Sequence, residues 1–213
     1  IYSVPSMRTI ANSMLAGAGI LAVAIGFASQ QTLSNIISGI FIVIFKPFRV
    51  NDRLKIRETL NGIVEDITLR HTVIRDFENR RIIVPNTLMG NEIIINSDLD
   101  DDRICNWLEI QLEHGTNIDH AKELLEKAAI AHPLSLDNRT PEEFDEDSST
   151  VKVRIVQINP LGITIRAWIW TANSAKGFEL KCDLYEIIYK KFNDEGISFS
   201  KINQSLNALK ENA

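Results

Sequence analysis

The sequence predicts a membrane protein of the α+β class, in which one membrane-crossing helix precedes a small β domain and an α/β domain. Three observations carry this prediction. No charged side chain occurs from Thr9 to Phe45, and basic residues follow this run. The remainder of the chain first shows strand patterns and then alternating strand and helix patterns. A bilayer core needs only ~20 apolar residues in helical form, whereas a soluble helix usually keeps a polar face. The predicted domains are residues 1–48, 49–102 and 103–213.

A basic cluster directly after the uncharged run predicts the orientation of the chain. Its members are Lys46, Arg49, Arg53, Lys55 and Arg57. Only Arg8 lies near the other end of the run. Because cytoplasmic flanks of membrane helices collect Lys and Arg, the two later domains are predicted to be cytoplasmic. The cluster is interpreted as a membrane-interface feature that sets topology or contacts lipid head groups.

Composition excludes several classes of function. The net charge of −5 argues against nucleic acid as a main partner, since phosphate binding needs a concentrated basic surface. Cys105 and Cys182 are far apart and are read as reduced thiols. The histidines lack paired ligand spacing, and we find no nucleophile motif or phosphate loop. We therefore expect no enzyme activity, no metal and no cofactor.

The first residue is Ile1, and no signal-peptide pattern follows it. We expect the chain to belong to a longer protein with further membrane helices upstream.

The first half of the uncharged run is rich in Gly and Ala. Thr9 to Ala28 as a helix would be about 30 Å long, enough to cross a bilayer. Gly19, Ala22 and Gly26 share one face, where small residues let membrane helices approach closely. Composition alone leaves open whether this face lines a pore or serves general membrane packing. A buried hairpin in a soluble protein is a further alternative, which would need a large partner surface.

The second half of the run is amphipathic. Its polar stripe consists of Gln30, Gln31, Ser34, Asn35 and Ser38. Its apolar face consists of Leu33, Ile36, Ile37, Ile40 and Ile44. Such a division suits the membrane interface. We expect a change of direction between Ser29 and Gly39, then a helix near the cytoplasmic surface that Pro47 terminates.

From Val50 to about Ser97 the pattern indicates short strands. The expected strands are Arg53–Ile56, Gly62–Leu69, Thr72–Phe77, Arg81–Val84 and Ile93–Ile95. Asn61-Gly62 and Glu78-Asn79 are predicted turns. Strands this short and close together favour a small, strongly bent sheet or barrel.

From Arg103 to about Ser200 the order of elements is β-α-β-β-α-β, the ferredoxin-like pattern. The expected elements are strand 106–112, helix 118–131, strands 151–158 and 163–171, helix 178–192 and a closing strand 197–199. Gly196 is expected to end the second helix. Asp137 to Thr150 is predicted to be an acidic loop, solvated or attracting cations. The tail after Lys201 is expected to be mobile or paired with partner subunits.

Several motifs resemble the small-conductance mechanosensitive channel (MscS) family. They are Ala24-Ile25-Gly26-Phe27-Ala28-Ser29-Gln30, Leu33-Ser34-Asn35, Ser38-Gly39, Phe45-Lys46-Pro47-Phe48-Arg49 and Ile83-Val84-Pro85-Asn86 with Asn91 and Asn96. The likeness runs from about Ala16 to Phe199, and the combination is specific. It implies a pore-lining helix with a bend, an Sm-like β domain and a ferredoxin-like domain.

The resemblance also implies a function and a set of site residues. It implies a homoheptameric channel of the bacterial inner membrane that opens under tension and releases ions and small osmolytes on hypo-osmotic shock. Val23 and Phe27 match the positions of the pore constriction. The pore-helix packing positions are Ala16, Gly19, Ala22, Ala24 and Gly26.

Three positions bear on how the pore helix packs and bends. Ile20 departs from the family pattern, where a small residue is usual. Gln31 replaces a glycine at which many family helices bend, whereas Gly39 matches a second family glycine. Gln31 and Gly39 are therefore the predicted bend positions.

Other readings of the same residues stay open. Phe27 can instead face lipid. A membrane-anchored binding or scaffold module without conduction is the alternative function, although a mere anchor needs no Gly/Ala-rich face. A soluble enzyme with a ferredoxin-like domain is disfavoured because the sequence offers no catalytic constellation.

Overall fold

The computed structural model describes residues 5–57, 60–146 and 148–200. The chain separates into two compact units, Ile1–Leu99 and Asp100–Ala213. The predicted further division of the first unit at Phe48 stays a prediction. The predicted tail after Lys201 lies outside the described residues.

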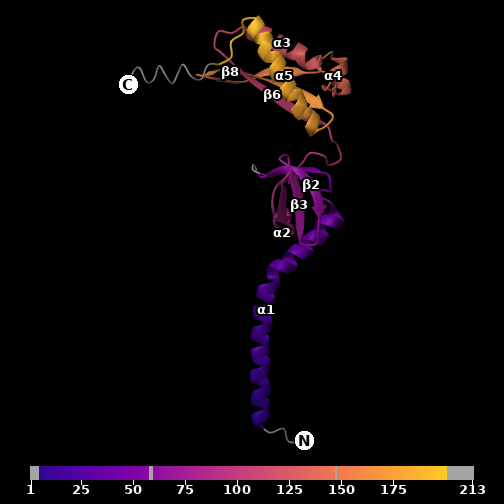
Figure 1. Cartoon of the computed structure of the whole chain (residues 1–213), viewed down its shortest axis with the longest axis vertical. Coiled ribbons are helices and arrows are strands. Elements are labelled where there is room, and N and C mark those ends of the chain that lie inside the picture. The colour runs from indigo at the N-terminus through magenta and orange to yellow at the C-terminus, as the bar shows by residue number, and fades with distance from the viewer. Residues whose placement is uncertain (1–4, 58–59, 147, 201–213) are drawn as a thin grey trace, which may run out of the picture. The chain divides into compact units, whose positions relative to one another are not determined.

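The N-terminal unit joins one long helix to a small sheet (Figure 1). Its elements are α1 (Pro5–Phe45), β1 (Arg53–Ile56), β2 (Leu60–Ile67), β3 (His71–Asp76), β4 (Arg81–Pro85), α2 (Asn86–Asn91) and β5 (Ile94–Asn96). The strands pair antiparallel in the order β4-β3-β2-β1-β5. A register shift in β2 between Val64 and Asp66 is of the kind that bends and twists a sheet.

Helix α1 is continuous where the sequence predicted two helices, and Figure 1 shows its axis changing direction before it reaches the strands. The helix ends two residues before Pro47, and Lys46 takes a left-handed conformation with φ 50°. Its last turns belong to the β domain, because Ile42 packs in one apolar core with residues of the strands and α2. The other members of that core are Phe48, Leu54, Ile56, Val64, Ile74, Val84 and Met89.

One turn prediction is wrong. Asn61 and Gly62 do not form a turn; they lie inside β2, opposite Lys55 and Leu54 of β1. A Cβ on Gly62 would come 2.6 Å from the backbone oxygen of Arg75 on β3. Glycine is present here because the neighbouring strand approaches closely.

The C-terminal unit contains the first five predicted elements in the predicted order, with an additional short helix, α4 (Pro141–Asp145). Those five are β6 (Ile104–Leu112), α3 (Ile118–Ile130), β7 (Lys152–Asn159), β8 (Gly162–Thr171) and α5 (Ser174–Asp194). The strands pair antiparallel in the order β6-β8-β7. Alternate residues of β6 and β8 form one core with α3 and α5, represented by Leu108, Ile169, Leu125 and Leu184.

The expected closing strand is present as a single bridge between Leu112 and Phe199. The amide of Ser200 donates to the oxygen of Gln111 at 3.0 Å on one side of that bridge. Gly196, with φ 68°, follows the C-cap of α5 as predicted. The amide of Ile197 then bonds the Phe192 oxygen at 2.8 Å, which closes the helix end in a Schellman motif.

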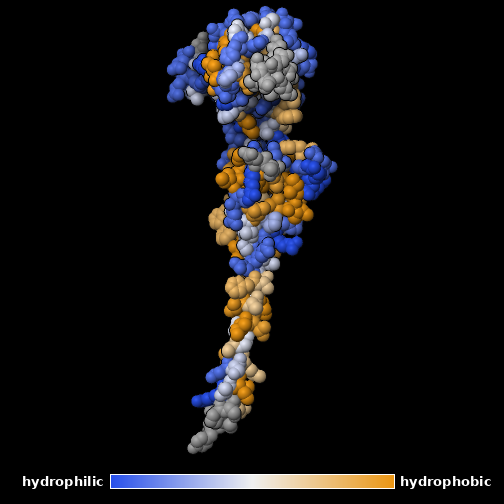
Figure 2. Space-filling view, turned by 90° about the vertical axis from the view of Figure 1, so that its left-hand side faces the viewer, coloured by the Kyte–Doolittle hydropathy of each residue, from blue (hydrophilic) through white to orange (hydrophobic). Residues whose placement is uncertain are grey.

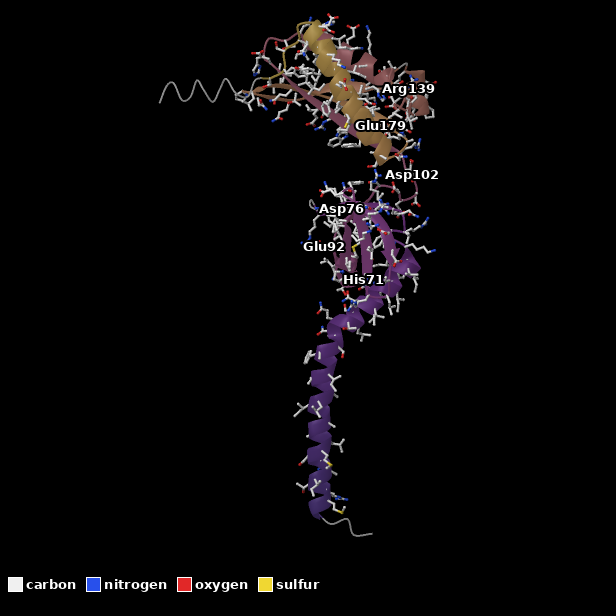
Figure 3. All side chains as sticks on the ribbon, in the orientation of Figure 1. His71, Asp76, Glu92, Asp102, Arg139 and Glu179 are labelled. Atoms are coloured by element: carbon white, nitrogen blue, oxygen red, sulfur yellow. The ribbon has the colours of Figure 1, made fainter. Side chains whose placement is uncertain are left out.

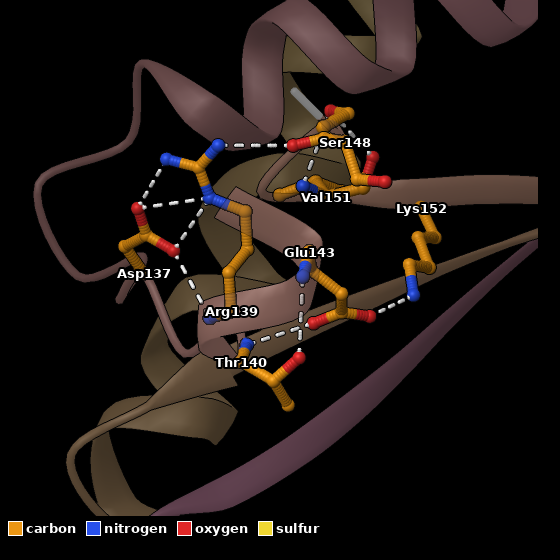
Figure 4. A network of polar contacts seen from close by, with 8 residues as sticks. Asp137, Arg139, Thr140, Glu143, Ser148, Val151 and Lys152 are labelled. Atoms are coloured by element: carbon orange, nitrogen blue, oxygen red, sulfur yellow. Dashed lines mark hydrogen bonds and ion pairs between the residues drawn. The ribbon is translucent and has the colours of Figure 1, made fainter. Parts of the chain in front are cut away.

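The segment predicted as an acidic loop contains the short helix α4, which is a correction. Thr140 and Glu143 cap it reciprocally: the Glu143 amide donates to Thr140 Oγ1 at 3.3 Å and the Thr140 amide to Glu143 Oε2 at 3.0 Å (Figure 4). Glu143 also pairs with Lys152, and the hydrogen bond from that lysine lowers the pKa of the Glu143 carboxyl. Glu143 is therefore a structural residue, while Glu142, Asp145 and Glu146 are exposed.

Candidate pore helix and its junction with the β domain

The N-terminal part of α1 is uncovered. From Met7 to Phe45 the helix is long and apolar enough to cross a membrane. The described residues bury no part of its most apolar stretch. Figure 2 shows hydrophobic colours along much of this helix and mainly hydrophilic ones on the visible face of the C-terminal unit. Because its backbone groups are paired within the helix, such a segment is stable in lipid.

The predicted constriction residues lie on this uncovered part, one helical turn apart. Val23 is 58% exposed and Phe27 is 73% exposed. Residues four apart in a helix share a face. Both side chains are largely uncovered by the described part of the chain. Their surface is therefore available to lipid or to another chain.

The predicted packing residues lie on the same uncovered part. All five are exposed: Ala16, Gly19, Ala22, Ala24 and Gly26. A Cβ built on Gly19 or Gly26 would meet no atom within 4 Å. Nothing within the described part of this chain requires glycine there, so any close packing at these positions involves another chain.

The polar stripe of α1 has a partner within the unit, which the sequence did not reveal. Asn35 is 5% exposed, and its Oδ1 accepts a hydrogen bond from the Thr87 amide at 3.0 Å. Its Nδ2 donates to the Gln31 oxygen at 2.9 Å. Thr87 lies in the first turn of α2, where backbone amides lack helical partners. Asn35 thus caps α2 from another helix.

At Gly39, α1 approaches the β domain closely. A Cβ at this position would come 2.5 Å from Asn86 Nδ2 and 2.5 Å from the Leu69 oxygen. Asn86 is fully buried: its Nδ2 donates to the Thr68 oxygen and its Oδ1 accepts from Thr72, both at 2.9 Å. The contacts give Gly39 a packing role, while its predicted role in bending stays a prediction, as does that of Gln31.

The residues of the basic cluster differ in their contacts, and the predicted role of the cluster at the membrane interface stays a prediction. Arg57 pairs with Glu92, and Arg53 Cζ lies 5.3 Å from the centre of the Phe77 ring. Lys46, Arg49 and Lys55 are exposed and make no ion pair with the described residues. The hydrogen bond from Arg57 lowers the pKa of Glu92 below its ordinary value of 4.5.

Among the residues the structure describes, no group of three His, Cys, Asp or Glu side chains is arranged to hold a metal.

Two family models match the chain. Residues 31–99 match the β domain of mechanosensitive ion channels, and residues 107–199 match the C-terminal part of the mechanosensitive ion channel MscS. The chain belongs to the MscS family. Together with the apolar helix α1, this confirms the predicted fold class, a membrane protein of the α+β class.

Similar proteins and solved structures agree with this family assignment. The chain is 26% identical over 197 residues to an uncharacterized MscS family protein of Archaeoglobus fulgidus, covering 92% of this chain and 65% of that relative. It is 32% identical over 177 residues to the miniconductance mechanosensitive channel MscM of Escherichia coli, covering 83% of this chain and 15% of that protein. The closed-state crystal structure of Helicobacter pylori MscS shares the fold with a TM-score of 0.76 at 21% identity, covering 90% of this chain and 72% of that one.

For this MscS-family chain we predict that Asn35→Ala loosens the junction between α1 and α2. The change leaves the half-buried Thr87 amide without its acceptor, at a cost of about 1 kcal/mol. Hydrogen exchange at Thr87 should then accelerate several-fold. Leu33→Ala, on the exposed apolar face of the same helix, is the control. Equal hydrogen-exchange rates at Thr87 in both variants would show that the hydrogen bond between Asn35 and Thr87 does not stabilise this junction.

A second prediction concerns pH. The Glu92 carboxyl has a lowered pKa in the folded protein, so its stabilising effect is present above 4.5 and is lost as the pH falls through the folded value. Arg57→Gln should therefore destabilise the protein at neutral pH, and the destabilisation should shrink progressively as the pH falls below 4.5. Urea unfolding followed by circular dichroism measures the destabilisation at each pH. A difference that does not shrink in acid would mean that Arg57 acts through packing.

Proposed function

We propose that this chain is a subunit of a mechanosensitive channel, which opens under membrane tension and releases ions and small osmolytes on hypo-osmotic shock. The observation that carries the proposal is α1, an apolar helix with an uncovered surface, in a chain of the MscS family. The chain spans 65% of its A. fulgidus relative, and 11% and 15% of the E. coli proteins MscK and MscM, which are named mechanosensitive channels.

Symmetry supports an oligomer. One helix cannot enclose a path for ions, but a closed ring of identical subunits can. The ring is proposed to be a heptamer in the bacterial inner membrane, as the family resemblance implies. The excess of Lys and Arg after Phe45 supports a cytoplasmic position for the later domains.

Val23 and Phe27 are proposed to form the constriction. In a ring, each would contribute one side chain per subunit to two apolar layers one helical turn apart. A narrow apolar ring blocks ions because water leaves it, without a physical plug. Tension favours whichever state occupies more membrane area, so the helices would tilt apart and the rings would widen.

The small residues of α1 are proposed to form the contacts between neighbouring pore helices. Their lack of bulk lets helix backbones approach and slide past one another. The exposed positions of Gly19 and Gly26, with nothing within 4 Å of a built Cβ, support this placement. No other packing role for these glycines is evident within the described residues.

We predict that Phe27→Ser eases opening, because a hydroxyl wets an apolar constriction. Patch recordings under suction, in cells lacking other such channels, should show a lower threshold than for the unaltered protein. Phe41→Ser makes the same change at another exposed position of α1 and should leave the threshold unchanged. If Phe27→Ser behaves like the control, Phe27 faces lipid. If the unaltered protein never conducts, the membrane-anchored scaffold module becomes the better account.

We predict that Gly26→Leu impairs assembly or raises the gating tension, because the larger side chain blocks close helix contact. Gly17→Leu is the matched control, since Gly17 is equally open within the chain but lies outside the proposed packing set. Oligomer yield and patch recordings measure the effect. Normal channels from Gly26→Leu would place Gly26 outside any tight contact.

A further inference from the structure

A polar cavity lies within the N-terminal unit, where α1 passes the end of the sheet. Its volume is about 300 Å³, the lower end of the range of small-molecule sites. Gln31, Thr32 and Asn35 line it from α1, Arg70 lines it from the segment that joins β2 to β3, and His71 lines it from the start of β3. Figure 3 shows His71 at the end of the β domain that α1 reaches.

The charged side chain that lines the cavity is that of Arg70. None of the lining residues is acidic. The Arg70 side chain is exposed and makes no ion pair or hydrogen bond with the described residues. His71 Nδ1 is buried and has no hydrogen-bond partner in the described part of the chain. Buried polar atoms without partners are rare in folded proteins, so an anionic acceptor beside these groups is favourable.

The segment that carries Arg70 is held in place by its own hydrogen bonds. Thr68 Oγ1 donates to the His71 oxygen at 2.7 Å and accepts from the His71 amide at 3.1 Å. The Asn86 amide donates to the Arg70 oxygen at 3.1 Å. A ligand therefore meets a wall that is already ordered, which lowers the entropy cost of binding.

The position along α1 indicates the source of the anion. A helix from Thr9 to Ser29 is about 30 Å long, which matches the hydrocarbon core of a bilayer. Gln31 and Thr32 lie two and three residues beyond Ser29, so if Thr9–Ser29 fills the core they fall at the depth of lipid phosphates. Ile83, which is 65% exposed, and Pro85 add an apolar part to the lining. Such a lining suits the glycerol portion of a lipid.

We propose that this cavity binds a phosphate group, and that in the membrane the phosphate is that of an anionic phospholipid. The Arg70 guanidinium supplies charge and paired donors, and the Gln31 amide and Thr32 hydroxyl supply further donors. The proposal concerns a ligand site and does not depend on whether the protein conducts ions.

The test is native mass spectrometry of the full-length protein in dodecyl maltoside, titrated separately with phosphatidylglycerol and with inorganic phosphate. Arg70→Gln should weaken saturable binding of phosphatidylglycerol by about tenfold or more. Arg154→Gln is the control, because Arg154 is exposed on β7 and makes no ion pair with the described residues. Thr32→Leu, which reduces the cavity from the helix side, should weaken binding without changing charge.

Each outcome decides the proposal. Arg70-dependent binding of phosphatidylglycerol alone supports the lipid source, and Arg70-dependent binding of both probes supports the phosphate chemistry with a soluble source as well. The proposal would be overturned if Arg70→Gln and Arg154→Gln weakened phosphatidylglycerol binding equally. It would also be overturned if neither probe bound saturably. The same spectra report the oligomer mass, so a failure to assemble is distinguished from a failure to bind.

Discussion

The uncovered apolar surface of α1 is the constraint on which the rest of this structure depends. From Met7 to Phe45 the helix carries no charge except Arg8, and none of its most apolar window is buried within the chain. Such a surface is unfavourable in water and requires lipid, other helices or both. The Gly/Ala-rich face is of the kind that packs closely against other membrane helices. Val23 and Phe27 have the apolar side chains that a constriction closed by dewetting requires.

The opposite end of the same helix is fixed. Asn35 caps α2, Gly39 lies against Asn86 and Leu69, and Ile42 is part of the β-domain core. Moving this end of α1 relative to the sheet would break the half-buried hydrogen bond between Asn35 and Thr87 and expose the apolar side chain of Ile42. Motion of α1 in the membrane is therefore coupled to the β domain unless the helix bends between the two parts. The proposed phosphate cavity lies at that transition, between Gln31 and Asn35.

The sequence predicts what local patterns determine. Absence of charge identifies α1, alternation identifies β6, β7 and β8, and helical periodicity identifies α3 and α5. Features that depend on distant neighbours were missed. Asn61-Gly62 resembles a turn, but the approach of Arg75 places it in a strand. The amphipathic pattern predicted a helix at the membrane interface, and it did not reveal that Asn35 in the polar stripe accepts a hydrogen bond from Thr87. The roles of Val23 and Phe27 depend on other copies of the chain and stay predictions.

The central claim is that copies of α1 cover one another around a path through the membrane. The most direct test is the native mass of the full-length protein extracted in mild detergent. The account predicts one dominant species whose mass is that of seven subunits. A sample that remains monomeric under conditions where both units stay folded would contradict it, because a lone α1 can neither enclose a path nor use its small-residue face.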